Sequence, residues 1–284
     1  MVVASHNARV SVGACLAALE LQQAGDVEII VVDNSTDGTA DIIKEKFPDI
    51  RLVVEPPSKL IPELWGVGIR ESTTDIVAIT TAHCVPREDW VLRILQAHEA
   101  PVSAIGGAIE NDEYADLIDW AVYFCRYSQH MLPFLESFES EIPGDNASYK
   151  LIHLKQCRHA WQNGFWEPAV HAELRNAGLR LLLSPSIVVY HKRSFRFWDF
   201  MKQRFQHGMA FGIWRTFCLS GPKWVLYVTL SPAIPFVHLF RIVRQVLIKR
   251  RHRKQFLFSL PLLVPFLLAW SIGELVGYLR GQTG

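Results

Sequence analysis

The sequence has 284 residues, which suits one sizeable hydrophobic core with an appendage and leaves no room for several compact domains. Its 29 Lys and Arg residues nearly balance its 28 Asp and Glu residues, and a net charge of +1 gives no reason to expect a nucleic-acid partner. Beyond residue 194, acidic residues become rare and apolar runs alternate with basic clusters. This asymmetry indicates that the C-terminal third is associated with a membrane.

The cysteines indicate a reducing compartment. They lie far apart and show neither the close pairs of a zinc site nor the even number of a disulfide framework. The sequence also begins without the charged start and cleavage site of a signal peptide, so we expect no export of the N-terminal domain. We therefore expect reduced thiols at all five positions, which are Cys15, Cys84, Cys125, Cys157 and Cys218.

The first 80 residues show an alternation of helical and strand patterns. Apolar residues at helical spacing predict a helix over 10–21, and the run VEIIVV predicts a strand over 27–32. The pattern continues with a helix, a strand, a helix and a strand, over 39–47, 51–54, 61–72 and 75–80. Such an alternation predicts an α/β fold with a Rossmann-like, mostly parallel sheet that is covered by helices.

Polar residues follow three of the predicted strands, directly after Ala4, Val32 and Thr80. In open parallel sheets, ligands bind outside the carboxyl ends of the strands. Polar residues at these turns also cap helices, so the pattern alone leaves both roles open. The three turns are Ser5-His6-Asn7, Asp33-Asn34-Ser35 and Thr81-Ala82-His83.

Five motifs in the expected order resemble the family 2 glycosyltransferases of the GT-A fold. Residues 29–39 (IIVVDNSTDGT) resemble the nucleotide-binding signature, and 2–7 (VVASHN) resemble the first strand and turn. Residues 75–90 resemble the metal-site strand, 144–149 (GDNASY) the acceptor-side loop, and 165–191 the closing helix and strand. One motif alone would be weak evidence, but the order of five is specific. The resemblance covers about residues 1–195 and implies a nucleotide-sugar donor.

The resemblance implies a donor site at the three polar turns. Asp33 matches the family residue that accepts hydrogen bonds from the base or the ribose, and turn capping is its alternative role. His6 and Asn7 are candidates for lining the base or the ribose. The complete predicted donor-binding set is Ser5, His6, Asn7, Asp33, Asn34, Ser35 and Thr81.

Glu167 is the predicted catalytic base. Glycosyl transfer passes through an oxocarbenium-like state, so the acceptor hydroxyl needs a carboxylate base and the departing diphosphate needs positive charge. The family usually supplies the base from a Glu-Asp pair at the start of the closing helix, where this sequence has Glu167-Pro168. The alternative for Glu167 is a helix N-terminal carboxylate that the helix dipole stabilises.

The predicted metal site departs from the family pattern. The resemblance implies an Asp-x-Asp motif, but this sequence has Thr81-Ala82-His83. Mg²⁺ prefers oxygen ligands, so a histidine favours Mn²⁺, with His191 as the second predicted ligand. Either Mn²⁺ or Mg²⁺ is the expected cofactor. In the alternative account, a protonated His83 holds a phosphate without any metal.

The resemblance places Asp145, Asn146 and Arg204 on the acceptor side. Arg204 belongs to residues 195–215, a segment rich in aromatic and basic residues that suits either a helix in a membrane interface or a helix that covers the domain.

The C-terminal region contains one predicted transmembrane helix, at 256–278, which is long enough to cross the hydrocarbon core and has Glu274 as its only charged residue. Residues 224–240 contain Pro232 and Pro235, and we expect them either to dip into the membrane and return or to lie at its interface. A basic loop between the two segments is expected to stay cytoplasmic and to bind anionic lipid headgroups. The expected domains are 1–195, 196–222 (interfacial) and 223–284.

These patterns predict a glycosyltransferase at the cytoplasmic face of a membrane, and the family resemblance implies that it inverts the anomeric configuration. We expect it to move a sugar from a UDP-linked or similar donor to a lipid-linked or membrane-proximal glycan acceptor. Two alternatives stay open. One is transfer to a polyprenyl phosphate, which needs no base, and the other is a non-catalytic membrane protein that binds nucleotide sugars.

Overall fold

The computed structural model describes residues 1–22, 27–192, 195–216 and 221–281. Cys218 and part of the predicted interfacial segment lie outside these residues. Two compact units are present: residues 1–112 with 130–193, and residues 113–129 with 194–284. Residues 113–129, which the sequence analysis assigned to the first domain, thus belong to the second unit.

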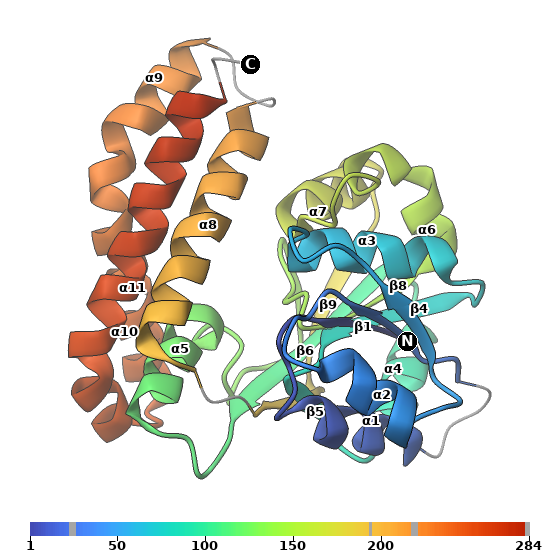
Figure 1. Ribbon diagram of the computed structural model, residues 1–284. Helices are drawn as coiled ribbons and strands as arrows, with labels where there is room; N and C mark the ends of the chain where they lie inside the picture. Colours follow the sequence, from blue (N-terminus) through green and yellow to red (C-terminus); the bar gives the residue numbers. More distant parts are fainter. Residues whose placement is uncertain (23–26, 193–194, 217–220, 282–284) are drawn as a thin grey trace. The chain divides into compact units, whose positions relative to one another are not determined.

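The first unit is a mixed α/β fold around a nine-stranded sheet, in the order β3-β2-β1-β4-β8-β6-β9-β5 with β7 paired to β9 (Figure 1). Strands β3, β2, β1 and β4 are parallel, whereas β8 runs antiparallel to both of its neighbours, β4 and β6. The nine strands are β1 (Val2–Ser5), β2 (Ile30–Asp33), β3 (Arg51–Val54), β4 (Ile76–Thr81), β5 (Cys84–Pro86), β6 (Ala104–Asn111), β7 (Ser137–Glu139), β8 (Asn146–Lys150) and β9 (Leu181–His191).

Helices cover both faces of this sheet. Helices α3, α6 and α7 lie on one face, and α1, α2 and α4 lie on the other (Figure 1). A large apolar cluster lies under α3, α6 and α7, where Leu64, Leu154 and Leu174 pack against strand residues such as Val32 and Ile79. The helices are α1 (Val12–Glu20), α2 (Thr39–Lys46), α3 (Ile61–Glu71), α4 (Trp90–His98), α6 (Leu151–Gln156), the 3-10 helix η1 (Arg158–Ala160) and α7 (Glu167–Asn176).

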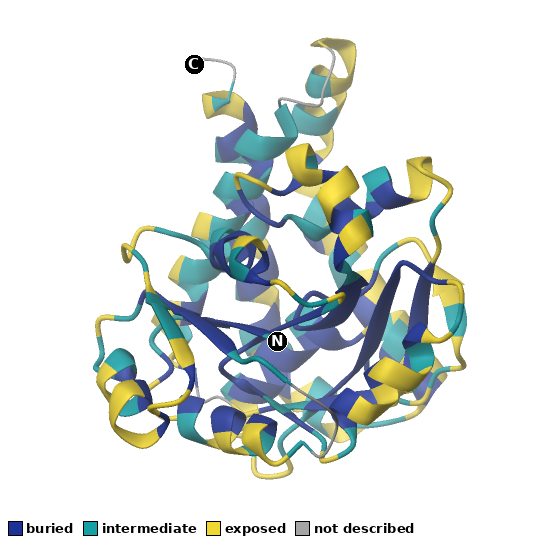
Figure 2. Ribbon diagram, turned by 90° about the vertical axis from the view of Figure 1, so that its right-hand side faces the viewer, coloured by how far each residue is buried: buried dark blue, intermediate teal, exposed yellow. Residues whose placement is uncertain are grey.

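The structure confirms the predicted α/β class and the elements predicted for residues 10–80 within a few residues at their ends. One motif needs a correction, because residues 144–149, expected as a loop, form strand β8 from Asn146 onward. Tyr149 and Ser148 pair there with Val77 and Ala78 of β4. Residues 146–149 of this strand are all buried, because the strand lies between β4 and β6 inside the sheet, and Figure 2 shows the strands of the sheet mostly in dark blue.

The second unit is helical. Helix α8 packs against α11, and α5 packs against α11 as well. The predicted basic loop is wrong as a loop, because Arg241, Arg244 and Lys249 lie in α10 and only residues 250–252 separate it from α11. The helices are α5 (Leu117–Tyr127), α8 (Phe197–Thr216), α9 (Gly221–Leu230), the 3-10 helix η2 (Ser231–Ala233), α10 (Ile234–Lys249) and α11 (Arg253–Arg280).

Two stretches of this unit are long and apolar enough to cross a membrane, namely Gly221–Lys249 and Arg253–Arg280. The second contains the predicted segment 256–278. The first is longer than expected, since α9, η2 and α10 follow one another directly across Pro232 and Pro235. Residues 224–240 are therefore helical for their full length.

Glycines bring α8 and α11 into direct backbone contact. A Cβ at Gly212 would lie 2.4 Å from the carbonyl oxygen of Glu274, and a Cβ at Gly277 would lie 2.3 Å from that of Met209. Glu274 is 3% exposed and accepts hydrogen bonds from Tyr278 and Trp270, and it pairs with Arg215 at 3.3 Å. This packing satisfies the only charge that the sequence analysis found in segment 256–278.

Substitution at this helix contact should separate the two helices. We expect Gly212→Ala to destabilise the detergent-solubilised protein by about 1–3 kcal/mol, because a close-packed contact cannot admit a methyl group without moving the backbone. Thermal unfolding measures the effect. Gly221→Ala is the control, since a Cβ at Gly221 meets no atom within 4 Å. Equal melting temperatures for the two variants would contradict this packing.

Candidate active site

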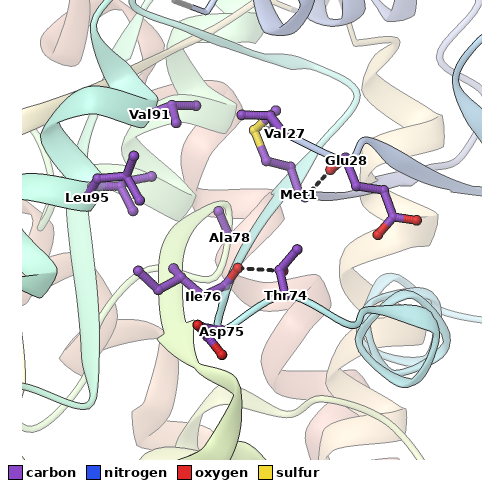
Figure 3. A pocket seen from close by; sticks show the side chains of 10 residues that line it. Met1, Val27, Glu28, Thr74, Asp75, Ile76, Ala78, Val91 and Leu95 are labelled. Carbon is purple, nitrogen blue, oxygen red and sulfur yellow. Dashed lines mark hydrogen bonds between the residues drawn. The ribbon is translucent and has the colours of Figure 1, made fainter. Parts of the chain in front are cut away.

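The three predicted polar turns lie together at the carboxyl ends of three neighbouring strands of the sheet. Strands β2, β1 and β4 are neighbours and run in the same direction, so Asp33, Ser5 and Thr81 end side by side. Near the amino ends of these strands, a cavity of about 370 Å³ is lined mainly by apolar residues, including Ile76, Val91 and Leu95 (Figure 3). The polar chemistry gathers at the carboxyl edge, which is where α/β proteins bind ligands.

A hydrogen-bond network joins the first two turns. The Ser35 hydroxyl donates to Asp33 Oδ1 over 2.6 Å and accepts from the backbone N–H of Asn7 over 2.7 Å. Asn7 Oδ1 accepts from the backbone N–H of Thr36, and Asn7 has a φ of 48°, a conformation that asparagine tolerates. Asp33 and Ser5 are fully buried. The turns therefore support each other in the conformation that a ligand would meet.

Asn34 holds a neighbouring loop in place. Its side-chain amide donates to the carbonyl oxygen of Lys59 over 2.6 Å and to that of Pro56, and its oxygen accepts from His6 Nδ1 over 2.8 Å. Both N–H donors of the amide are used within the protein. Among the predicted donor-binding residues, Asn34 thus has a side chain with a clear structural task, as Asn7 and Ser35 do.

The third turn forms a buried polar cluster with the start of β8. The Thr81 hydroxyl donates to Asp145 Oδ1 over 2.9 Å and lies 3.1 Å from His83 Nε2. The Thr80 hydroxyl donates to the backbone carbonyl of Asp145 over 2.8 Å. Asp145, predicted to lie on the acceptor side, is therefore placed directly beside the Thr81-Ala82-His83 turn. The tertiary structure supplies here a carboxylate that this turn lacks.

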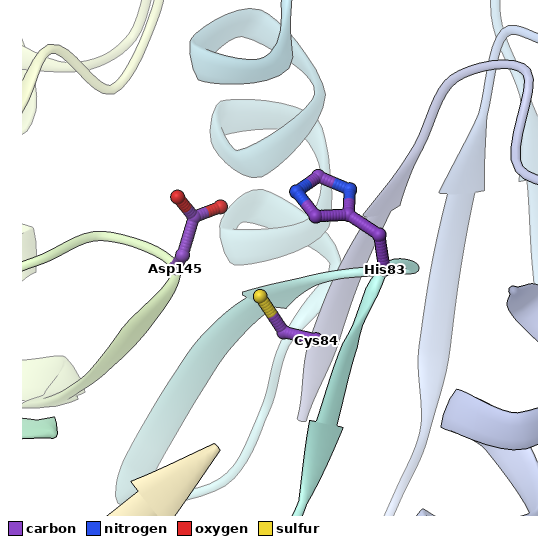
Figure 4. A group of neighbouring side chains, drawn as sticks. All are labelled: His83, Cys84 and Asp145. Atoms are coloured by element: carbon purple, nitrogen blue, oxygen red, sulfur yellow. The ribbon is translucent and has the colours of Figure 1, made fainter. Parts of the chain in front are cut away.

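His83, Cys84 and Asp145 are arranged as a candidate metal site. One ligand atom from each lies within 4.8 Å of the others, all three residues are buried, and their side chains point toward one another (Figure 4). The His191 ring packs edge-on against the His83 ring with centroids 5.0 Å apart. Imidazole, carboxylate and thiolate donors suit a transition metal better than Mg²⁺, which prefers oxygen ligands. The donor set therefore fits a divalent transition metal.

Sequence reasoning missed Cys84 as a member of this cluster. It directly follows His83, but a cysteine far from any other cysteine gives no metal signal. Its Sγ lies 3.5 Å from the Thr81 hydroxyl. The antiparallel pairing of Cys84 with His191 also brings two parts of the sequence together that lie more than a hundred residues apart. Only the sheet register shows this proximity.

Asn146 has a structural task like that of Asn34. Its amide nitrogen donates to the carbonyl oxygens of Ala108 and Ile187, and its oxygen accepts from Trp90 Nε1 over 2.8 Å. The residue is 1% exposed. Asn146 thus anchors the end of the loop that carries Asp145. These contacts give the buried Asn146 side chain a structural role that does not depend on an acceptor.

Glu167 is the first residue of α7 and is half-buried. A Cβ at Gly144 would lie 2.5 Å from Glu167 Oε1 and 2.8 Å from the Trp65 ring. Only glycine lets the loop 140–145 pass this close to the carboxylate. Gly144 and Asp145 are adjacent, so one short loop lies beside both the predicted base and the candidate metal site.

Arg204 lies on α8 in the second unit, where its guanidinium lies 4.2 Å from the centre of the Trp270 ring. This contact is a cation–π interaction within the helical unit. The acceptor-side role of Arg204 stays a prediction.

Two solved structures have a fold similar to that of this chain. The mannosyltransferase PcManGT from Pyrobaculum calidifontis, in complex with GDP-Man and Mn²⁺, has 16% sequence identity and a TM-score of 0.58, and the match covers 96% of this chain and 86% of that one. Residues 1–349 of TarS from S. aureus, in complex with UDP-GlcNAc, have 14% identity and a TM-score of 0.50, with 69% of this chain and 58% of that chain covered. The fold is thus that of the GT-A glycosyltransferases.

The family model "Glycosyl transferase family 2" matches residues 1–150, more than half of the sequence. The chain therefore belongs to glycosyltransferase family 2, as its five motifs indicated. No curated protein matches the sequence.

Proposed function

We propose that the protein is an inverting glycosyltransferase that uses Glu167 as its base. It moves a sugar from a nucleotide donor, UDP-linked in the first instance, to a lipid-linked or membrane-proximal glycan. The observation that carries the proposal is the loop 140–145, which lies against Glu167 at Gly144 and against Thr81 at Asp145. The loop therefore lies beside two groups with complementary chemistry. The Glu167 carboxylate is suited to activate a hydroxyl, and the cluster around Asp145 is suited to hold a diphosphate through a metal.

The reaction needs one displacement. Glu167 accepts the proton of the acceptor hydroxyl while that oxygen forms a bond to the anomeric carbon of the donor sugar. The bond between the anomeric carbon and the diphosphate oxygen breaks on the opposite face, and its electron pair leaves with the nucleoside diphosphate. A single attack from the opposite face inverts the anomeric configuration.

His83, Cys84 and Asp145 would hold the metal, with His191 packed behind His83. When bound, a divalent cation offsets the negative charge that develops on the departing diphosphate. The Thr81 hydroxyl orients the Asp145 carboxylate, and the Thr80 hydroxyl fixes the backbone of the same residue. PcManGT was solved with GDP-Man and Mn²⁺, which supports a transition metal beside the donor in this fold.

A screen of nucleotide sugars tests the proposal. Each donor is added to the detergent-solubilised protein with Mn²⁺, and thermal stability is measured, because a ligand that binds the native state raises its stability. Donors that stabilise the protein are then tested for transfer to lipid-linked acceptors. Stabilisation without transfer or donor hydrolysis would favour a non-catalytic binding protein. Transfer to a polyprenyl phosphate that is unaffected by Glu167→Gln would favour the phosphate-acceptor alternative.

The membrane part of the proposal rests on the helices of the second unit. Because 253–280 is a continuous apolar helix, we expect the protein to stay in the membrane pellet after washing with alkaline carbonate, which releases helices that lie only at the surface. Fractionation followed by immunoblotting measures this. Release into the supernatant would reduce the segment to a surface anchor.

The catalytic unit should lie on the cytoplasmic side, where nucleotide sugars are made. Basic residues around the turn 250–252 favour the same side, because basic segments near membrane helices stay cytoplasmic. Both parts lie on that side when Gly221–Lys249 lies along the membrane surface or returns, and a full crossing of this stretch would separate them.

A further inference from the structure

Three residues outside the predicted site form a hydrogen-bonded chain in the first unit. The His171 ring has 0% exposure, and both of its nitrogens have partners. Nδ1 lies 2.7 Å from Glu141 Oε2, and Nε2 lies 2.9 Å from the Tyr149 hydroxyl. The three residues come from the loop before β8, from β8 itself and from α7. The chain therefore ties a loop and a strand to one helix.

The hydrogen-bond roles follow from the chemistry of the partners. An ionised carboxylate can only accept hydrogen bonds, so His171 Nδ1–H donates a hydrogen bond to Glu141 Oε2. Burial, followed by the nearby charge of Glu167, raises the pKa of Tyr149 well above its usual range, so the phenol keeps its proton. With a neutral imidazole, the Tyr149 hydroxyl donates to Nε2. Each buried polar group in the chain is thus satisfied.

Two members of this chain, His171 and Glu141, connect it to the predicted base. On α7, Glu167 precedes His171 by four residues, which places both side chains on one face of the helix. Glu141 starts the stretch that reaches Gly144, beside the Glu167 carboxylate, and Asp145, beside Thr81 and His83. The far end of the stretch is fixed by the buried amide of Asn146. The start of the stretch, by contrast, is tied to α7 by the Glu141 side chain, which is 40% exposed.

We infer that Glu141, His171 and Tyr149 are positioning residues, which hold the loop 140–145 against α7 and so keep Asp145 and Glu167 at the separation that transfer requires. The inference rests on the proposed role of Glu167. Loss of the Glu141 contact removes the side-chain hydrogen bond between the start of the loop and α7, while Ile142 stays in the core and the Asn146 end stays anchored. Misplacement of reacting groups by about 1 Å can cost roughly a hundredfold in rate. The effect should appear in turnover, because the donor-binding turns after β1 and β2 are held by other contacts.

Glu141→Ala is the main test, because this half-exposed position can be changed without opening a core cavity. We expect kcat to fall at least tenfold while the KM for the donor stays within about twofold. Glu141→Gln keeps an oxygen that accepts from Nδ1–H and should restore most of the turnover. Tyr149→Phe removes the hydroxyl and keeps the ring, and it should lower kcat as well. His159→Ala is the matched control, since His159 contacts Glu173 of the same helix at 3.4 Å but is 67% exposed.

Amide hydrogen exchange gives a readout that needs no transfer. In Glu141→Ala we expect the amides of residues 142, 144 and 145 to exchange at least tenfold faster than in the wild type, with no change in His159→Ala; residue 143 is a proline and has no amide proton. Unchanged exchange, or wild-type kcat in both Glu141→Ala and Tyr149→Phe, would overturn the inference. If the wild type transfers no sugar but exchange still accelerates, the loop attachment holds and the proposed function fails instead.

Discussion

Glu167→Gln should lower turnover by about a hundredfold or more, which corresponds to about 2.7 kcal/mol of transition-state stabilisation. Glutamine keeps the size of the side chain at the start of α7 and its place beside Gly144, but it cannot accept the proton of the acceptor hydroxyl. Donor binding should stay nearly intact, because the residues predicted to hold the nucleotide lie on other turns. Steady-state kinetics and donor titration by calorimetry separate the two effects.

Glu173→Gln is the control for this variant. Glu173 lies on the same helix, its side chain is 41% exposed, and it pairs with His159 in a surface contact that contributes little. Its turnover should match that of the wild type. Wild-type turnover in Glu167→Gln would remove the residue from catalysis and support a helix N-terminal role or an acceptor that is already anionic.

Asp145→Asn should raise the Mn²⁺ concentration needed for half-maximal activity at least tenfold. Asparagine can still accept the hydrogen bond from Thr81 but loses the charge that a divalent cation requires. In the wild type, EDTA should abolish activity and Mn²⁺ should restore it better than Mg²⁺, because His83 offers nitrogen and Cys84 offers sulfur. Activity should also fall at acidic pH, since protonated ligands cannot bind the metal.

Asp75→Asn controls for the loss of one carboxylate. Asp75 is exposed and lies next to the amino end of β4, the strand that ends at Thr81, so its metal dependence should be that of the wild type. Full activity in EDTA, together with an unaffected Asp145→Asn, would leave Asp145 as a structural partner of Thr80 and Thr81. If activity instead rises as pH falls and ignores EDTA, a protonated His83 holds the phosphate directly.

The sequence predicted well wherever one local pattern decides the structure. Residues 51–54 form β3 and residues 61–71 form α3, as predicted. In α3 apolar residues such as Leu64 and Trp65 are buried, whereas β3 is a partly exposed strand at the edge of the sheet. The apolar run at 256–278 likewise needs only its own composition to form a long helix. The second segment was harder, since Pro232 and Pro235 suggested a break. They fall within a 3-10 turn and at the start of α10, where proline is tolerated.

The candidate site shows the same division. The sequence by itself determined the α/β class, the family and the three polar turns after β1, β2 and β4. The succession of strands and helices along the chain and the residues of the turns are both visible in local patterns. It could not place Asp145 beside His83, join Cys84 to that pair or set Gly144 against Glu167. Those contacts depend on the antiparallel insertion of β8 between β4 and β6 and on the register of β5 with β9. Only the tertiary structure decided them, because a register pairs residues that lie far apart in the sequence and leaves no periodic signal in either segment.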